Sequence, residues 1–293
     1  MQQNSIPTRL LAAGTDRNDR SSHQGFTRVE LMAAVGAIGL LAAVALPSLA
    51  NAHLKSAYAV CLGNQRQLIQ SVHNFAQDNQ DAIVPSDYTK PDGARVTLNG
   101  GGYWAGPTGD ISAGISREQA LQRVQDGLRQ GPLWSYIQAT EVFHCPGDER
   151  VSLRKPGSGW AFDSYSKSEA MAGSGFNPGP LYKRLAQVTD PKMSFVFCEE
   201  ADPRNYNLGA WVLQTTPPGW VDGFGPFHEG GSMFALLDGH TELHRWRDPQ
   251  TLQAAVNSTQ GLFSFFWSGG GAQNPDFRWV WDRYQYPGWK ALP

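Results

Sequence analysis

The chain has 293 residues, a formal net charge of −2, 41% hydrophobic residues and 17% charged residues. This length provides ample material for a hydrophobic core. The near-neutral charge argues against a nucleic-acid binder, which needs a basic surface to neutralise phosphates. The composition also excludes a strongly charged disordered chain. Three cysteines are too few for a small fold that depends on many disulfides.

The amino-terminal region contains an uncharged stretch from Leu31 to Ala52. A helix needs about 20 mostly apolar residues to cross a bilayer, so the sequence predicts a transmembrane segment over about residues 31–50. Within residues 1–25, Arg9, Arg17 and Arg20 stand against Asp16 and Asp19, and the positive-inside rule then places these residues in the cytoplasm. The alternative is an ordinary secretory signal, because Ala50-Asn51-Ala52 fits the A-x-A cleavage pattern.

The helical pattern continues beyond the apolar stretch. Apolar residues recur at intervals of three and four between Leu54 and Ala76, which is typical of an amphipathic helix. We therefore expect one helix from Phe26 to about Gln80, ended by the polar run before Pro85. Pro47 removes a backbone donor and is predicted to kink this helix. A second helix is expected near Ser116–Arg129.

The remaining chain reads as strands and long loops rich in Gly, Pro and Trp. Lys192–Glu199 is predicted to be a strand, and Leu208–Gln214 is expected to pair with it. Asp238-Gly239 lies between two strand-like runs and predicts a two-residue type I′ hairpin in which Leu237 faces His240. That register places on one face the residues His240, Glu242, His244, Trp246, Ala235 and Met233, and on the other Leu243 and Phe234.

The segment from Gly25 and Phe26 to Glu30 resembles the class III signal of type IV prepilins and pseudopilins. The resemblance implies that a prepilin peptidase cuts between Gly25 and Phe26 and that the new amino group is methylated. Glu30 and Pro47 then fall at the fifth and twenty-second mature positions, where the family has Glu and Pro. Gln24 departs from the Lys or Arg usual there. A carboxylate at the start of an apolar helix is costly unless it is paired, so we expect Glu30 to offset the new amine during assembly.

Three further motifs resemble bacterial prepilin-type proteins named for a processing-associated H-x9-DG motif. His228 is followed after nine residues by Asp238-Gly239. The other two motifs are Cys61-Leu62-Gly63-Asn64-Gln65-Arg66-Gln67 and Cys145-Pro146-Gly147-Asp148. The resemblance favours a Cys61–Cys145 disulfide, which leaves Cys198 as a buried thiol. A Cys145–Cys198 pair stays open as the alternative.

A metal site is one interpretation of the acidic and histidine residues near the hairpin. The candidates are His228, Asp238, His240, Glu242 and His244. We favour a structural role for them, since Asp238 is explained as a turn residue and His228 as a loop-fixing hydrogen-bonding group. Resemblance to type II secretion major pseudopilins makes Ca²⁺ the first metal to test. No nucleophile elbow, phosphate-binding loop or opposed carboxylate pair is found, so an enzyme is not expected.

The resemblance implies a pilin-like α+β fold, in which a long amino-terminal helix, transmembrane in its first half, packs on an antiparallel sheet. The expected parts are a leader (1–25), the long helix (26–80) and an exported β-rich domain (81–293). The expected protein is a single-pass inner-membrane subunit that assembles with copies of itself into a type II secretion or type IV pilus-like fibre. Its expected partners are the prepilin peptidase, other pseudopilins and the assembly platform. The alternative is a membrane-anchored module that binds polysaccharide or another surface ligand.

Overall fold

The computed structural model describes residues 27–85, 87–89, 95–97, 106–109, 111, 114–152, 161–173, 175–203, 207 and 210–293. Side chains are described for these residues except 44–54, 87–89 and 95–97. The predicted leader and both residues of the predicted cleavage site, Gly25 and Phe26, lie outside the described residues. The chain forms two units, residues 1–50 and 51–293.

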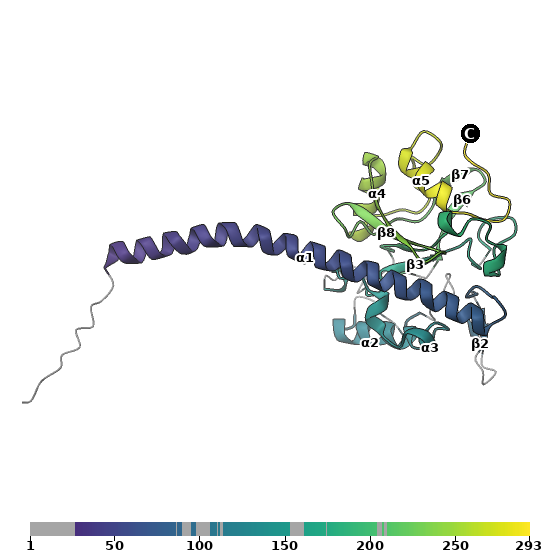
Figure 1. The fold of residues 1–293 in the computed structure, drawn as a ribbon, viewed down its shortest axis with the longest axis horizontal. Helices are drawn as coiled ribbons and strands as arrows, with labels where there is room; N and C mark the ends of the chain where they lie inside the picture. Colours follow the sequence, from purple (N-terminus) through teal and green to yellow (C-terminus); the bar gives the residue numbers. More distant parts are fainter. Residues whose placement is uncertain are drawn as a thin grey trace, which may run out of the picture. The chain divides into compact units, whose positions relative to one another are not determined.

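The longest element is helix α1 (Arg28–Asp78), which is coloured purple to blue in Figure 1. Thr27 begins it with a reciprocal cap. The Thr27 backbone N–H donates to Glu30 Oε2 at 2.8 Å, and the Glu30 N–H donates to the Thr27 hydroxyl at 3.2 Å. The helix ends before Gln80 and Asp81, which adopt positive φ angles of 57° and 66°. A right-handed α-helix cannot continue through such angles.

The prediction of a transmembrane first half is wrong. A membrane span needs about 20 mostly apolar residues in one helix, and in the part of the chain that the structure describes no helix meets that requirement. The associated prediction of a single-pass inner-membrane protein is corrected with it.

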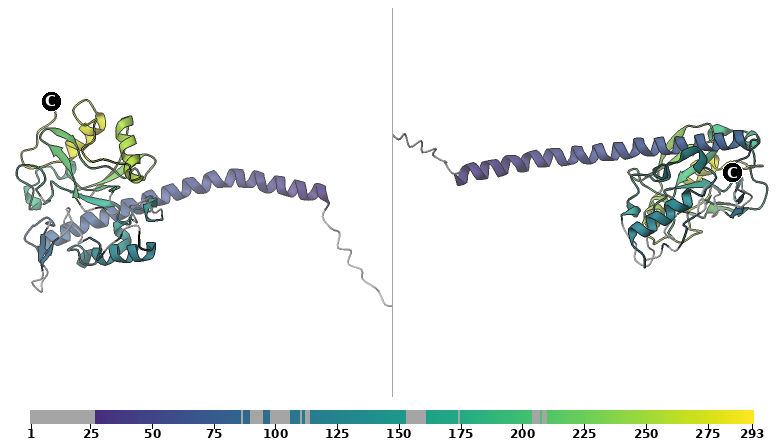
Figure 2. Two further views of the ribbon diagram at one scale, coloured as in Figure 1. Left: turned by 180° about the vertical axis from the view of Figure 1, so that it is seen from behind. Right: turned by 90° about the horizontal axis from the view of Figure 1, so that it is seen from below.

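The domain formed by residues 51–293 is built around a five-stranded sheet with the order β5-β3-β4-β8-β9, and Figure 2 shows this domain from two further sides. β3 and β5 are parallel, and the other neighbours are antiparallel. The strands of this sheet are β3 (Tyr165–Ser168), β4 (Phe195–Glu199), β5 (Ala210–Trp211), β8 (Gly231–Leu236) and β9 (Thr241–Arg245).

The remaining described elements are short. Two-stranded sheets are formed by β1 (Asp87–Thr89) with β2 (Arg95–Thr97) and by β6 (Leu213–Thr215) with β7 (Pro218–Trp220). The other helices are α2 (Arg117–Leu128), α3 (Trp134–Ile137), α4 (Pro249–Thr259) and α5 (Pro275–Arg283). The helix expected near 116–129 is confirmed as α2, with Ser116 as the residue whose side chain caps it.

The predicted partner of the Lys192–Glu199 strand is wrong. The strand itself is present as β4, but Leu208–Gln214 contributes β5, which pairs with β3 rather than with β4. β3, for which the sequence predicts no strand, occupies that side of β4 and pairs Tyr165 with Glu199. The short polar run of β3 (YSKS) lacks the apolar alternation that marks a strand.

The hairpin of β8 and β9 is present, but its predicted register is wrong by one residue. Phe234 pairs with Glu242 and Ser232 with His244. The Gly239 N–H bonds to the Leu236 carbonyl at 2.9 Å, and Gly239 has φ 95°. These contacts define a three-residue loop ending in a left-handed glycine, which is the next commonest hairpin connection after the two-residue type. Glu242 and His244 therefore share a face with Phe234 instead of Met233 and Ala235.

The two faces of the sheet bury different hydrophobic cores. One core packs the carboxyl-terminal half of α1 on the sheet through Leu68, Val72, Phe197 and Met233. The other is aromatic and lies between the sheet, the β6–β7 region and the carboxyl-terminal helices. Its fully or nearly fully buried members include Phe195, Trp211, Trp220, Phe224, Phe234, Trp246, Phe277, Trp281 and Tyr284. The domain is thus layered, with α1 and α4–α5 on opposite faces of the sheet (Figure 1).

Indole N–H groups fasten loops to the aromatic core. The Trp211 indole donates to the Gly223 carbonyl at 2.9 Å, and the Trp267 indole donates to the Asp222 carbonyl at 3.1 Å. Trp267 also stacks on Trp220 with ring centroids 4.9 Å apart. Buried aromatic rings thereby compensate for the shortness of the strands.

We predict opposite effects of alanine at two glycines. Gly239→Ala forces a side chain into φ 95° although no atom lies within 4 Å of its Cβ, so backbone strain alone is expected to lower the free energy of unfolding by about 1–2 kcal/mol. Gly63→Ala, in the interior of α1 with equally open space, is expected to raise it by about 0.5–1 kcal/mol. Equilibrium urea unfolding measures both. Equal effects at the two positions would contradict the assigned loop.

Candidate functional site

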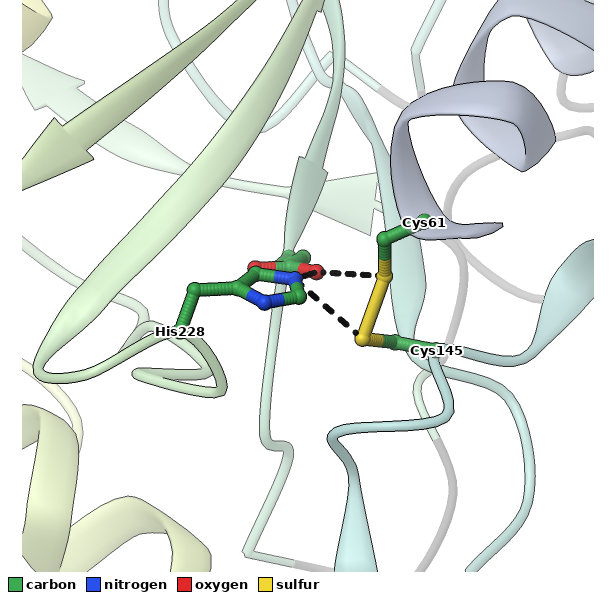
Figure 3. A group of neighbouring side chains, drawn as sticks. Cys61, Cys145 and His228 are labelled. Atoms are coloured by element: carbon green, nitrogen blue, oxygen red, sulfur yellow. Dashed lines mark hydrogen bonds and ion pairs between the residues drawn. A yellow bond between two sulfur atoms is a disulfide. The ribbon is translucent and has the colours of Figure 1, made fainter. Parts of the chain in front are cut away.

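Four buried side chains meet between α1 and the sheet, and we call Cys61, Cys145, Glu199 and His228 the Cys–Glu–His cluster. One ligand atom from each residue lies within 4.8 Å of those of the other three. Cys61 and Cys145 form a disulfide with a Cα–Cα distance of 5.2 Å, and Cys198 is a free, buried cysteine. Figure 3 shows the His228 ring directed at this disulfide.

The contacts within the cluster are close. His228 Nε2 lies 3.0 Å from Glu199 Oε1 and 3.4 Å from Cys145 Sγ. Glu199 Oε1 lies 3.1 Å from Cys61 Sγ. The Tyr165 hydroxyl lies 2.9 Å from the same sulfur and is the donor there, since a disulfide sulfur carries no proton. A carboxylate and an imidazole therefore face both sulfurs.

Each member of the cluster comes from a different element. Cys61 lies on α1 and Glu199 ends β4, whereas Cys145 follows a 3₁₀ turn (Thr140–Phe143). Asn64, one turn further along α1, donates to the carbonyls of Glu141 and His144 at 3.2 and 2.8 Å. The Cys-x-x-Asn spacing thus places the disulfide and the amide that holds its loop on the same side of one helix.

A tight turn positions His228. Its N–H and carbonyl both bond to Gly231, and the two residues between them, Glu229 and Gly230, have φ angles of 51° and 78°. Two consecutive positive φ angles are the signature of a type I′ turn. The turn that the sequence analysis assigned to Asp238-Gly239 therefore occurs instead just before β8, and it aims the imidazole at the cluster.

The buried carboxylate of Glu199 is stabilised by two hydrogen-bonding partners, His228 and the Met233 N–H. Burial raises the pKa of the Glu199 carboxyl, and the hydrogen bonds from His228 and from the Met233 N–H oppose that rise. The Met233 N–H donates to Oε2 at 2.9 Å, which leaves Oε1 directed at His228 and the sulfurs. Burial and the charge of Glu199 raise the pKa of Tyr165 well above its usual range, so its hydroxyl stays protonated as a donor.

A buried ion pair lies beside the cluster. Asp148, the last residue of the Cys145-Pro146-Gly147-Asp148 motif, accepts two hydrogen bonds from the Arg150 side chain at 2.8 and 2.6 Å. Burial opposes ionisation of Asp148, but the Arg150 guanidinium outweighs it and lowers the pKa of the carboxyl. Ser164 links this pair to the cluster, because its hydroxyl donates to Asp148 and accepts from the Cys145 N–H.

A surface pocket of about 360 Å³ reaches the cluster from outside. His228 forms part of its wall, and Tyr58 contacts the imidazole edge-on with ring centroids 5.7 Å apart. Lys55, Glu229, Leu243 and Arg245 complete the lining. Arg245 and Glu229 pair at 2.9 Å on the exposed rim. The histidine is therefore the member of the cluster that lies nearest to solvent.

The five candidate metal ligands of the hairpin do not come together. His228 belongs to the Cys–Glu–His cluster, and His244 Nε2 pairs with Asp276 at 2.8 Å near α5. Asp238, His240 and Glu242 form a separate surface group in which both nitrogens of His240 face carboxylates. His228 precedes β8, whereas Asp238 and Gly239 lie in the loop that follows it. The nine-residue spacing of the motif therefore corresponds to the length of one strand with its turns. It does not mark one site.

The amino-terminal candidates are only partly described. Glu30 is exposed, and hydrogen bonds from the Thr27 backbone and hydroxyl lower the pKa of its carboxyl. It therefore has a partner within its own helix. Pro47 lies within the bounds of α1, but its side chain lies outside the described ones. The predicted kink stays a prediction.

Sequence reasoning missed Glu199 as a site residue. The sequence indicates it only as the last residue of the predicted strand Lys192–Glu199. The sequence does carry one indication, because Glu199 is a charged residue at the end of a continuous apolar strand. A carboxylate buried in such a strand requires specific partners. Tyr165 gave no signal, because β3 was not predicted.

No protein-family model, curated protein or solved structure matches this chain.

We predict that the disulfide is a major source of stability. Its two cysteines are 84 residues apart, and in the chain-entropy model a loop of that length contributes about 4–5 kcal/mol. The double variant Cys61→Ala/Cys145→Ala is expected to lose that amount in equilibrium urea unfolding. The matched control Cys198→Ala, which removes a buried thiol without a disulfide, is expected to lose about 1 kcal/mol. Equal losses in the two proteins would contradict the prediction.

Proposed function

We propose that the chain is a prepilin- or pseudopilin-like structural subunit, cut after Gly25, methylated on Phe26 and assembled into a fibre through the first part of α1. The observation that carries the proposal is that every residue from Thr27 to Ala43 is exposed. The exposed large side chains are Val29, Leu31, Met32, Val35, Ile38, Leu40 and Leu41, each between 58% and 77% accessible.

The energetics favour a covered state for this segment. Burying one such side chain contributes about 1.5–3 kcal/mol, so seven together offer on the order of 10–20 kcal/mol. Association costs an estimated 4–15 kcal/mol in lost freedom and ordering. Packing this segment against equivalent helices of other copies therefore provides a gain of the size that association requires. A fibre buries it in every subunit except those at the two ends.

Small residues in the same segment support helix-to-helix packing. No atom lies within 4 Å of a Cβ built at Gly36 or Gly39, so both positions are open to a neighbour. Ala33 and Ala37 lie close by on the same helix. Small side chains let two helix backbones approach closely.

Glu30 has two roles in this proposal. Within its own subunit it completes the cap with Thr27, and the lowered pKa of its carboxyl keeps it negatively charged. In the fibre, that charge attracts the methylated amino group of a neighbouring Phe26 inside a poorly hydrated helix bundle. The partners that follow are the prepilin peptidase, further pilin-like subunits and their assembly platform, and the role is structural rather than catalytic.

We predict a processed amino terminus. Mass spectrometry of the protein isolated from its native source is expected to find a chain that begins at N-methylated Phe26. Retention of the first 25 residues would refute the proposal. A start at His53, as after cleavage of an ordinary secretory signal behind Ala52, would refute it too.

We predict that the charge and the cap at the start of α1 are separable. Glu30→Gln keeps a hydrogen-bonding side chain but removes the charge, so it is expected to leave cleavage intact and reduce incorporation into fibres at least tenfold. Thr27→Ala is the matched control, because it removes the capping hydroxyl and keeps the carboxylate. It is expected to assemble at close to the normal level. Fibre yield is measured by quantifying sheared or sedimented protein, and normal yield from Glu30→Gln would exclude the charge pairing.

A further inference from the structure

We propose that the Cys–Glu–His cluster is a zinc site that opens when its disulfide is reduced. The ligands would be the thiolates of Cys61 and Cys145, Nε2 of His228 and a carboxylate oxygen of Glu199. Two thiolates, an imidazole and a carboxylate are all common zinc ligands, and four of them match the tetrahedral coordination of a closed site. The proposal is independent of fibre assembly.

The distances in the oxidised protein are already close to those of a metal site. Zinc bonds of about 2.3 Å to sulfur and 2.0–2.2 Å to nitrogen or oxygen separate tetrahedral ligands by about 3.3–3.8 Å. The observed separations are 3.4 Å from Cys145 Sγ to His228 Nε2, 3.1 Å from Cys61 Sγ to Glu199 Oε1 and 3.0 Å from His228 Nε2 to Glu199 Oε1. To hold a metal, the two bonded sulfurs must move apart by rotation of their side chains, and the two contacts of Glu199 Oε1 must lengthen by a few tenths of an ångström.

The surroundings already orient the ligands. The Met233 N–H holds Oε2 of Glu199 and so directs Oε1 to the centre of the cluster. The Tyr165 hydroxyl donates to the Cys61 sulfur, an interaction that a thiolate strengthens. The Tyr58 ring packs against the edge of His228. Such outer contacts fix ligand geometry and raise metal affinity.

The pocket beside His228 gives the site an entrance. Cys61, Cys145 and Glu199 have no accessible surface, whereas His228 retains 5% and forms the pocket wall. A dithiol reductant can transfer two electrons and two protons to the disulfide, yielding two protein thiols and the cyclic disulfide of the reductant. Zinc then displaces the two thiol protons and the proton on His228 Nε2, which returns to solvent or moves to Nδ1. No other oxidant or reductant is needed.

The disulfide and the metal are mutually exclusive, but both join the same elements. Either one ties α1 to the loop that holds Cys145, and the metal adds β4 and the turn before β8. The reduced chain would therefore keep its helix docked by zinc, and oxidation would release the ion. The cluster would cross-link the same elements through a disulfide under oxidising conditions and through zinc under reducing conditions.

The test uses the full chain, kept monomeric in a non-ionic detergent, in oxidised form and after reduction with a phosphine reductant. Metal content after incubation with Zn²⁺ and desalting is expected to be one ion per reduced chain and less than a tenth of an ion per oxidised chain. Co²⁺ in place of Zn²⁺ is expected to give the thiolate-to-metal absorption and strong visible bands of a tetrahedral sulfur-containing site. Zinc is also expected to raise the melting temperature of the reduced chain only.

Variants separate this site from other metal-binding groups. Glu199→Gln and His228→Ala are each expected to weaken zinc binding by the reduced chain more than about tenfold. The control variants Cys198→Ser, at the buried thiol outside the cluster, and His240→Ala, in the surface acidic group, are expected to bind as the unaltered chain does. Failure of the reduced chain to bind zinc would overturn the proposal. So would equal binding by the oxidised chain, or binding that is insensitive to Glu199→Gln and His228→Ala.

Discussion

The packing of α1 on the sheet depends on the Cys–Glu–His cluster, where polar side chains are buried between the helix and the sheet. The cross-link between Cys61 and Cys145 fixes the helix to a loop, and Glu199, at the end of β4, lies against that junction. A carboxylate with no accessible surface is tolerable only because an imidazole and a backbone N–H contact it. The tight turn at Glu229-Gly230 serves the same requirement, since it brings His228 to that carboxylate.

Much of the fold could be predicted wherever a pattern repeats over many residues. The spacing of apolar residues between Leu54 and Ala76 predicted the helix that packs on the sheet, and the apolar run before Glu199 predicted β4. The strand order could not be predicted, because β3 is a four-residue polar segment whose burial comes entirely from its neighbours. The hairpin register failed for a local reason: Asp-Gly also fits a three-residue loop, and only the pairing of Phe234 with Glu242 decides between the two.

The site was less predictable than the fold. Motif resemblance favoured a Cys61–Cys145 disulfide, but it did not indicate that His228 meets this pair, because the three residues are contributed by elements far apart in sequence. The hairpin histidines looked like one group since they share a strand, yet His244 and His240 engage different carboxylates. The apolar stretch at the amino terminus was read as a membrane span, an interpretation that the described helix does not support.

The two outermost strands of the five-stranded sheet restrict how another chain could add to the sheet. β5 has only two residues, and β9 carries Glu242, His244 and Arg245 along its length. A very short edge strand and an edge strand with charged side chains both disfavour pairing with a strand of another chain. Lateral growth of the sheet into a cross-β aggregate is thereby discouraged. Any contact between two copies of the chain is therefore expected to use side chains rather than the backbone hydrogen bonds of the sheet edges.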